Sequence, residues 1–168
     1  IQDYVPAISP GLNIIEFSHN GFKVSNSRFP ENVFNDNAVL VYTGKPHNSG
    51  INNFEVYKSA VEGNLATLTA LKKIRDVTKD LKSVLLAQDF EKLSGIFKRE
   101  YQARVELTPL FSSPDIEQVE KVSLKAGAEA IKICGAGGGG CVVVWAPKKK
   151  EKVISALKEG GMKILDVS

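Results

Sequence analysis

A glycine-dense run between two apolar segments is the part of the sequence with the clearest potential for chemistry. It follows Lys132-Ile133-Cys134, precedes Cys141, and consists of Gly135, Ala136, Gly137, Gly138, Gly139 and Gly140. Glycines let a backbone approach a ligand closely and present N–H groups to anionic oxygens. The run lacks the Gly-Lys-Ser/Thr of a Walker loop and the strand-to-helix setting of a dinucleotide fingerprint. Composition alone therefore favours a phosphate-binding turn and a flexible hairpin loop equally.

The elements that would position this run predict an α+β fold. Apolar, β-rich runs bounded by turn residues predict a hairpin and four further strands, over residues 12–17, 21–25, 38–43, 130–134, 141–145 and 162–167. Apolar residues at three- and four-residue spacing predict helices over residues 65–85, 89–101, 114–126 and 148–159, with Asp89 as a cap and Asn35-Asp36-Asn37 as a turn. We interpret this order as a ferredoxin-like split β-α-β with extra helices in the first crossover, preceded by a β-hairpin.

Composition and charge restrict the class of protein. The 168 residues, 43% of them apolar, suffice for the core of one compact domain. The net charge of +3 comes from interspersed charges, so no nucleic acid is indicated. No apolar run approaches the roughly 20 residues of a membrane span, so no membrane partner is expected. Two cysteines suit a reducing compartment, and we predict a cytoplasmic protein whose natural start lies upstream of Ile1.

Four segments resemble parts of a known kinase family. Residues 135–141 resemble the third conserved motif of the GHMP kinases (galactokinase, homoserine kinase, mevalonate kinase and phosphomevalonate kinase), which lies in their C-terminal domain. Gln2-Asp3-Tyr4 and residues 11–17, Gly-Leu-Asn-Ile-Ile-Glu-Phe, resemble the Gln-Asp-Gln-Tyr and Gly-Gly-Leu-Asn-x-Ile-Glu-Phe run of the heptose-phosphate and sugar-kinase branch. Residues 43–50 resemble the Thr-Gly-x-x-Arg-x-Ser segment of that branch, with His47 where arginine is common.

The resemblance implies an ATP-dependent kinase that phosphorylates a hydroxyl of a sugar or sugar phosphate, with Mg²⁺ bridging phosphate oxygens. It implies that the glycine run is a cofactor-binding turn beside the active site, where it supports a phosphate loop supplied by the N-terminal domain. Asp3 then falls on the catalytic aspartate, which orients the acceptor hydroxyl and accepts its proton. The candidate substrate-binding residues are Tyr4, Lys45, His47 and Ser49.

The resemblance also divides the chain. Residues 1–35 would be the end of the N-terminal kinase domain, with the catalytic Asp segment and the β-hairpin. Residues 36–168 would form the GHMP kinase C-terminal domain. The rest of the N-terminal domain would then be a missing partner, so the chain by itself is expected to be inactive.

Two alternatives remain open from the sequence. The acceptor is mevalonate or another non-sugar alcohol in some GHMP kinases. In the other class, the chain is a non-catalytic ferredoxin-like module for ligand binding or regulation. No metal site is expected, because Cys134 and Cys141 lack neighbouring ligands. Arg99 and Arg104, which lie near Glu100 and Glu106 in the sequence, are interpreted as surface charges or members of ion pairs.

Replacing the candidate catalytic carboxylate tests the resemblance. In the complete enzyme, Asp3→Asn should lower kcat by about 10²-fold or more, the scale of general-base catalysis, because an amide does not accept the proton. The dissociation constant of the nucleotide should stay nearly unchanged. Steady-state kinetics and a nucleotide titration measure the two quantities, and near-normal turnover would remove Asp3 from the mechanism.

Overall fold

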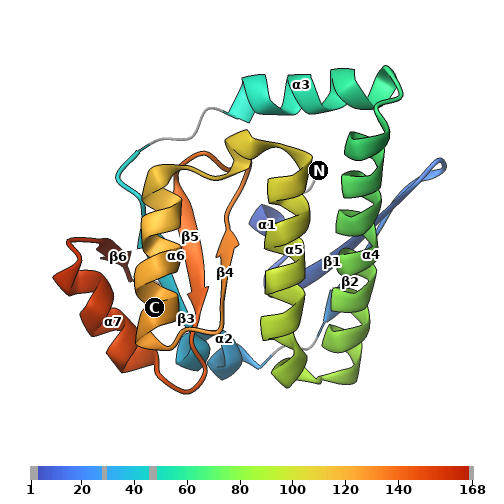
Figure 1. Ribbon diagram of the computed structural model, residues 1–168. Coiled ribbons are helices and arrows are strands. Elements are labelled where there is room, and N and C mark those ends of the chain that lie inside the picture. The colour runs from blue at the N-terminus through green and yellow to red at the C-terminus, as the bar shows by residue number, and fades with distance from the viewer. Residues whose placement is uncertain (1–3, 28–29, 46–48, 167–168) are drawn as a thin grey trace.

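The computed structural model describes residues 4–27, 30–45 and 49–166 of the chain (Figure 1). Its helices are α1 (Tyr4–Ile8), α2 (Glu31–Asn37), α3 (Ser49–Val61), α4 (Leu65–Ala87), α5 (Leu93–Leu107), α6 (Pro114–Ala126) and α7 (Lys150–Glu159). Its strands are β1 (Leu12–Ser18), β2 (Gly21–Ser27), β3 (Ala38–Tyr42), β4 (Ala130–Ile133), β5 (Cys141–Trp145) and β6 (Lys163–Leu165). Within the described ranges, no helix combines the length and the apolar composition that crossing a bilayer requires.

The central sheet has the connectivity of a ferredoxin-like fold. Its strands lie in the order β4-β5-β3-β6, and every neighbouring pair is antiparallel. β5 therefore lies between β3 and β4, the two strands that the first crossover joins through α3 to α6. This arrangement confirms the predicted split β-α-β with extra helices, and α7 forms the second crossover. β1 and β2 pair only with each other in a separate antiparallel hairpin, as predicted.

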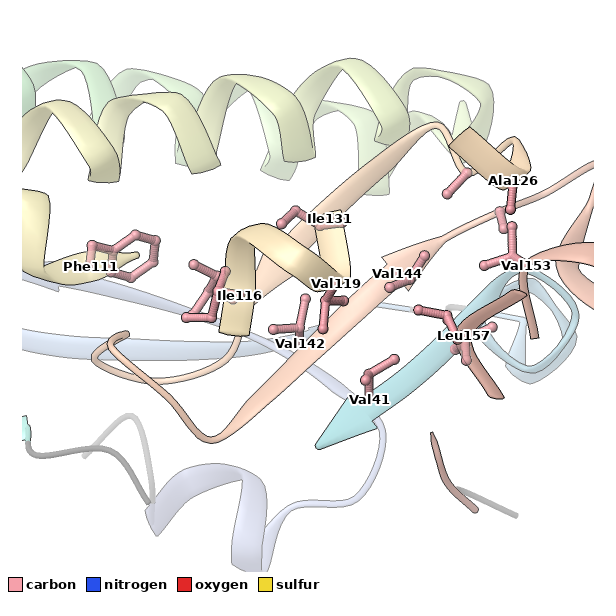
Figure 2. Close-up of a cluster of buried hydrophobic side chains, with 14 residues drawn as sticks. Val41, Phe111, Ile116, Val119, Ala126, Ile131, Val142, Val144, Val153 and Leu157 are labelled. Atoms are coloured by element: carbon pink, nitrogen blue, oxygen red, sulfur yellow. The ribbon is translucent and has the colours of Figure 1, made fainter. Parts of the chain in front are cut away.

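Alternation along the strands directs one face of the sheet toward α6 and α7. Successive strand residues point to opposite faces, and the register places Val41 beside Val142 and Val39 beside Val144. These valines form a continuous core with apolar side chains of the two helices (Figure 2). The helix residues of this core are Ile116, Val119, Ala126, Val153 and Leu157.

The other face of the sheet meets α4 and α5 at the end where Trp145 lies. Trp145 is 2% exposed and lies edge-on to Phe97 of α5, with ring centroids 5.5 Å apart. On β4 the same alternation directs Ala130 and Lys132 to this face, and Lys132 thereby contacts Glu100 of α5. The sheet thus carries one face that is wholly apolar and one that brings a charged residue to the inserted helices.

Helix α2 was not predicted. Its last three residues, 35–37, were predicted as a turn because asparagine and aspartate favour turns. In the structure the Asn37 side-chain amide donates to the carbonyl of Val33 at 2.7 Å, and the ring of Phe34 lies edge-on to Trp145 at 5.7 Å. Tertiary packing therefore overrides the local preference. The predicted domain boundary between residues 35 and 36 falls inside α2 and remains a prediction.

The predicted cap at Asp89 is wrong. Its side chain makes no capping hydrogen bond, and its carboxylate instead pairs with Lys92 at 2.5 Å within the 3₁₀ turn Phe90–Lys92. α5 accordingly begins at Leu93, later than the pattern predicted. The composition of good helix formers begins at residue 53, whereas the first helix of the crossover, α3, already begins at Ser49, and the final strand β6 is shorter than predicted.

Candidate functional site

The glycine turn, residues 135–140, joins β4 to β5 (Figure 1). Its ends are held together by the Cys134 N–H, which donates to the carbonyl of Cys141 at 2.9 Å. Four of its glycines have positive φ angles: Gly135 (71°), Gly137 (81°), Gly138 (75°) and Gly140 (80°). A residue with a Cβ rarely adopts this conformation. The density of glycine in the sequence is therefore a requirement of the backbone path.

The turn is anchored to two other parts of the chain. The Gly138 N–H donates to the carbonyl of Phe111, and the Gly140 N–H donates to the carbonyl of Lys45, each at 2.8 Å. The Gly140 carbonyl accepts from both the backbone N–H and the hydroxyl of Thr43, each at 2.9 Å. These contacts tie the turn to the end of β3 and to the 3₁₀ turn Pro109–Phe111 before α6. The glycine turn is therefore held by hydrogen bonds and is not a solvated loop without contacts.

Gly137 packs directly against Phe111. It is buried against Phe111, and a Cβ at this position would lie 2.4 Å from Cδ2 and 2.5 Å from the carbonyl oxygen of Phe111. No real Cβ contact is that short, so only glycine fits. The contact with Phe111 thus fixes the position of the turn relative to the helices.

Several N–H groups of the turn remain available. With the described residues, the N–H groups of Gly135, Ala136, Gly137 and Gly139 make no hydrogen bond; Gly137 and Gly139 are buried, whereas Gly135 is exposed and Ala136 is half-buried. Consecutive backbone N–H groups in a turn of this kind form a concavity that binds anions. The N–H groups of Gly135 and Ala136 are therefore the donors of this turn that an anion could reach.

Two cations lie beside the turn. Lys45, whose carbonyl anchors Gly140, forms an ion pair with Asp115 at 2.7 Å and has a largely exposed side chain. Arg104 of α5 donates from Nη1 to the carbonyl of Gly135 at 3.3 Å, and its guanidinium carbon lies 5.1 Å from the centroid of the Phe111 ring. Asp115 balances the charge of Lys45, whereas Arg104 and Lys132 share the one carboxylate of Glu100, so a net positive charge remains on the Arg104 side of the turn.

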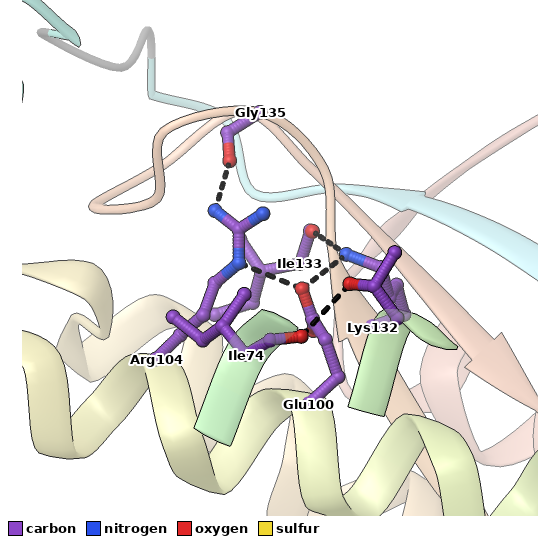
Figure 3. A network of polar contacts seen from close by, with 7 residues as sticks. Ile74, Glu100, Arg104, Lys132, Ile133 and Gly135 are labelled. Atoms are coloured by element: carbon purple, nitrogen blue, oxygen red, sulfur yellow. Dashed lines mark hydrogen bonds and ion pairs between the residues drawn. The ribbon is translucent and has the colours of Figure 1, made fainter. Parts of the chain in front are cut away.

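Arg104 belongs to an ionic cluster around a buried carboxylate, and its cations are partly exposed (Figure 3). Glu100 accepts with Oε1 from Arg104 Nε at 2.7 Å and from Lys132 Nζ at 3.0 Å. Arg104 forms an ion pair, as predicted, but its partner Glu100 is only 8% exposed, and this burial was not predicted. Its position in the sequence, in step with the buried residues Ile96 and Phe97 of the same helix, is the signal that could have revealed it. Arg99, by contrast, forms a surface ion pair with Asp80 at 2.7 Å, as predicted.

The other predicted site residues are less informative. Asp3 and His47 lie outside the described residues, and the side chain of Ser49, which opens α3, is not described. Tyr4 begins α1 with its side chain 75% exposed. Of the predicted substrate residues, the structure brings only Lys45 to the glycine turn among those it describes. Their roles in substrate binding remain predictions.

The two cysteines flank the turn as free, half-buried thiols. Burial raises the pKa of the Cys134 thiol above its ordinary value, so this thiol is protonated at neutral pH. Within the described part of the chain, no group of three histidine, cysteine, aspartate or glutamate residues could hold a metal ion.

The turn is not part of two hollows on the described surface. One lies between α4 and α5, with Lys73, Asp76 and Glu106 in its lining, and the other is lined by α5, α6 and β4. Neither is lined by a residue of the turn. Neither hollow is therefore the binding place of an anion held by the glycine turn.

The fold and the turn define an α+β domain that offers backbone N–H groups and two nearby cations to an anionic ligand. Comparison with known proteins identifies this domain. Residues 79–161 match the family model described as GHMP kinases C terminal, and over this segment the chain belongs to that family. The matched segment contains α5, α6, the glycine turn and α7.

Relatives extend beyond this segment. The D-glycero-alpha-D-manno-heptose 7-phosphate kinase of Campylobacter jejuni is 26% identical over 163 residues, which are 94% of this chain and 48% of the relative. The chain thus spans about half the length of this curated relative.

Solved structures confirm the fold. The mevalonate kinase of L. major in complex with R-mevalonate has a TM-score of 0.79 at 17% identity, over 94% of this chain and 47% of that one. The phosphomevalonate kinase of Streptococcus pneumoniae in complex with phosphomevalonate and AMPPNP has a TM-score of 0.69 at 16% identity, over 87% and 42% of the two chains.

A matched pair of variants tests whether the contact between Gly137 and Phe111 fixes the turn. Gly137 and Gly63 have nearly the same φ, 81° and 79°, but a Cβ at Gly63 would meet nothing within 4 Å. Gly63→Ala should cost about 1 kcal/mol of unfolding free energy, the penalty of a left-handed alanine. Gly137→Ala should cost a further ~2 kcal/mol, because its methyl group overpacks against Phe111.

Urea unfolding of both variants of the 168-residue chain measures the difference. Equal losses of unfolding free energy would show that Phe111 does not fix the turn.

Proposed function

We propose that the chain is the C-terminal part of an ATP-dependent small-molecule kinase that phosphorylates a hydroxyl of a sugar phosphate. The heptose 7-phosphate kinase, which aligns with 94% of the chain, supports the sugar-phosphate acceptor. The observation that carries the proposal is the anchored glycine turn, in which the N–H groups of Gly135 and Ala136 have no partner among the described residues and lie near Arg104.

The residues of the turn fit a nucleotide phosphate. ATP supplies the phosphoryl group, and the turn would stabilise its phosphate oxygens directly or support a neighbouring phosphate loop of the other half of the enzyme. The carboxylate beside the turn, Asp115, is engaged by Lys45. We therefore place Mg²⁺ on the phosphate oxygens rather than on this turn. Asp3 would orient the acceptor hydroxyl and accept its proton.

Two further parts of the proposal concern the acceptor and the compartment. The structural likeness to the mevalonate kinase of L. major favours mevalonate as the second candidate acceptor. The two free cysteines suit a reducing environment, and a cytoplasmic location is part of the proposal.

The 168-residue chain alone should show no acceptor-dependent ADP release, because the phosphate loop and the partner cation of Asp3 belong to the proposed N-terminal half. A protein that joins this chain to its N-terminal half should release ADP with D-glycero-D-manno-heptose 7-phosphate. A coupled ADP assay with heptose 7-phosphate and mevalonate in parallel makes the measurement.

Each result of this assay separates the candidates. Turnover with mevalonate alone would replace the acceptor and keep the class of enzyme. Robust turnover by the 168-residue chain would contradict the half-site account. An inactive complete protein would favour the non-catalytic module.

A further inference from the structure

We propose that Glu100 is a positioning residue of the glycine turn: its buried carboxylate holds Arg104 and Lys132 so that the turn keeps the shape it presents to a phosphate group. The nucleotide part of this proposal rests on the proposed function. The structural part concerns only contacts within the described chain, so the two can fail separately.

Glu100 occupies a position where an apolar residue is expected. It lies on the face of α5 that packs toward the sheet, and its neighbours on that face are all buried: Leu93, Ile96, Phe97 and Ala103. A charge at this depth costs free energy unless it is paired. Solubility therefore does not explain the presence of a carboxylate at position 100.

Both ion pairs of Glu100 use the same carboxylate oxygen. Glu100 Oε1 accepts from Arg104 and from Lys132, whereas the buried Oε2 has no partner among the described residues. Lys132 Nζ also donates to the carbonyl of Ile133 on β4, at 3.1 Å (Figure 3). Because both cations contact the same oxygen, they lie close to each other. The carboxylate offsets their mutual repulsion.

Arg104 carries the effect to the turn. It donates to the carbonyl of Gly135 and lies over the ring of Phe111, whose carbonyl accepts the Gly138 N–H. The chain of contacts from Glu100 through Arg104 thus reaches both the first residue of the turn and its anchor. Gly140 is held independently by Lys45.

The test replaces the charge and keeps the shape. In Glu100→Gln the two cations repel each other, so Arg104 should leave Gly135 and weaken the Gly138 anchor. Amide exchange measured by NMR on the 168-residue chain should become about tenfold faster at Gly138, the size of coupling found within one ion-pair network. Exchange at Gly140 should change much less. In the complete enzyme kcat/KM for ATP should fall by a similar factor, with the KM of the acceptor unchanged.

Three further variants make the test specific. Glu106→Gln is the control, because Glu106 lies on the same helix and pairs with Lys73 at the surface. Arg104→Met cuts the contact with the turn and should speed exchange at Gly138 even if Glu100→Gln does not fold. Glu100→Gln combined with Lys132→Met removes the repulsion, and the glutamine oxygen can still accept from Arg104, so protection at Gly138 should recover.

The outcomes are distinct. Exchange at Gly138 that matches the Glu106→Gln control, or no recovery in the double variant, would overturn the proposal, because a packing role predicts additive losses. Faster exchange at Gly138 with an unchanged kcat/KM for ATP would support the contact network and overturn the nucleotide role of the turn.

Discussion

The contact between Gly137 and Phe111 is the constraint on which the candidate site depends. The backbone of the turn lies so close to Phe111 that no side chain fits between them. Phe111 ends the 3₁₀ turn that connects α5 to α6, and both helices belong to the long first crossover. The crossover helices therefore set the position of the turn that joins β4 to β5.

This constraint explains how the helices inserted into a ferredoxin-like fold position the candidate site. α6 packs on one face of the sheet and fixes the apolar core, whereas α5 covers the other face and carries Glu100 and Arg104. The alternation of β4 sends Ile131 and Ile133 to the first face and Lys132 to the second. One strand thus links the core to the charges beside the turn.

Much of this architecture could be predicted from the sequence. Strands β3 and β5 are continuous apolar runs, and α6 begins at Pro114 and ends at Ala126, with Gly127 as its C-cap, so local signals fix them. Helix α2 could not be predicted, because its Asn-Asp-Asn end favours a turn until Phe34 packs on Trp145. The glycine turn was found from composition and resemblance. Its anchors were not, since Phe111 and Thr43 are distant in sequence.

The charged cluster was missed for a related reason. Glu100 and Arg104 are four residues apart on one helix, the spacing of an ordinary surface pair. Only the fold brings Lys132 to the same oxygen and buries the carboxylate. Likewise, the relatives share this fold at low identity although their names refer to different acceptors, a heptose phosphate and mevalonate. The fold of this half therefore does not determine the acceptor.

The central claim is that the glycine turn, residues 135–140, contacts or directly supports the nucleotide phosphates. Hydrogen exchange on the complete protein, with and without a non-hydrolysable ATP analogue, tests it most directly. The account predicts slower exchange across residues 135–140 on binding, with no change in the hairpin turn between β1 and β2. Saturating nucleotide binding that leaves exchange in the glycine turn unchanged would contradict it.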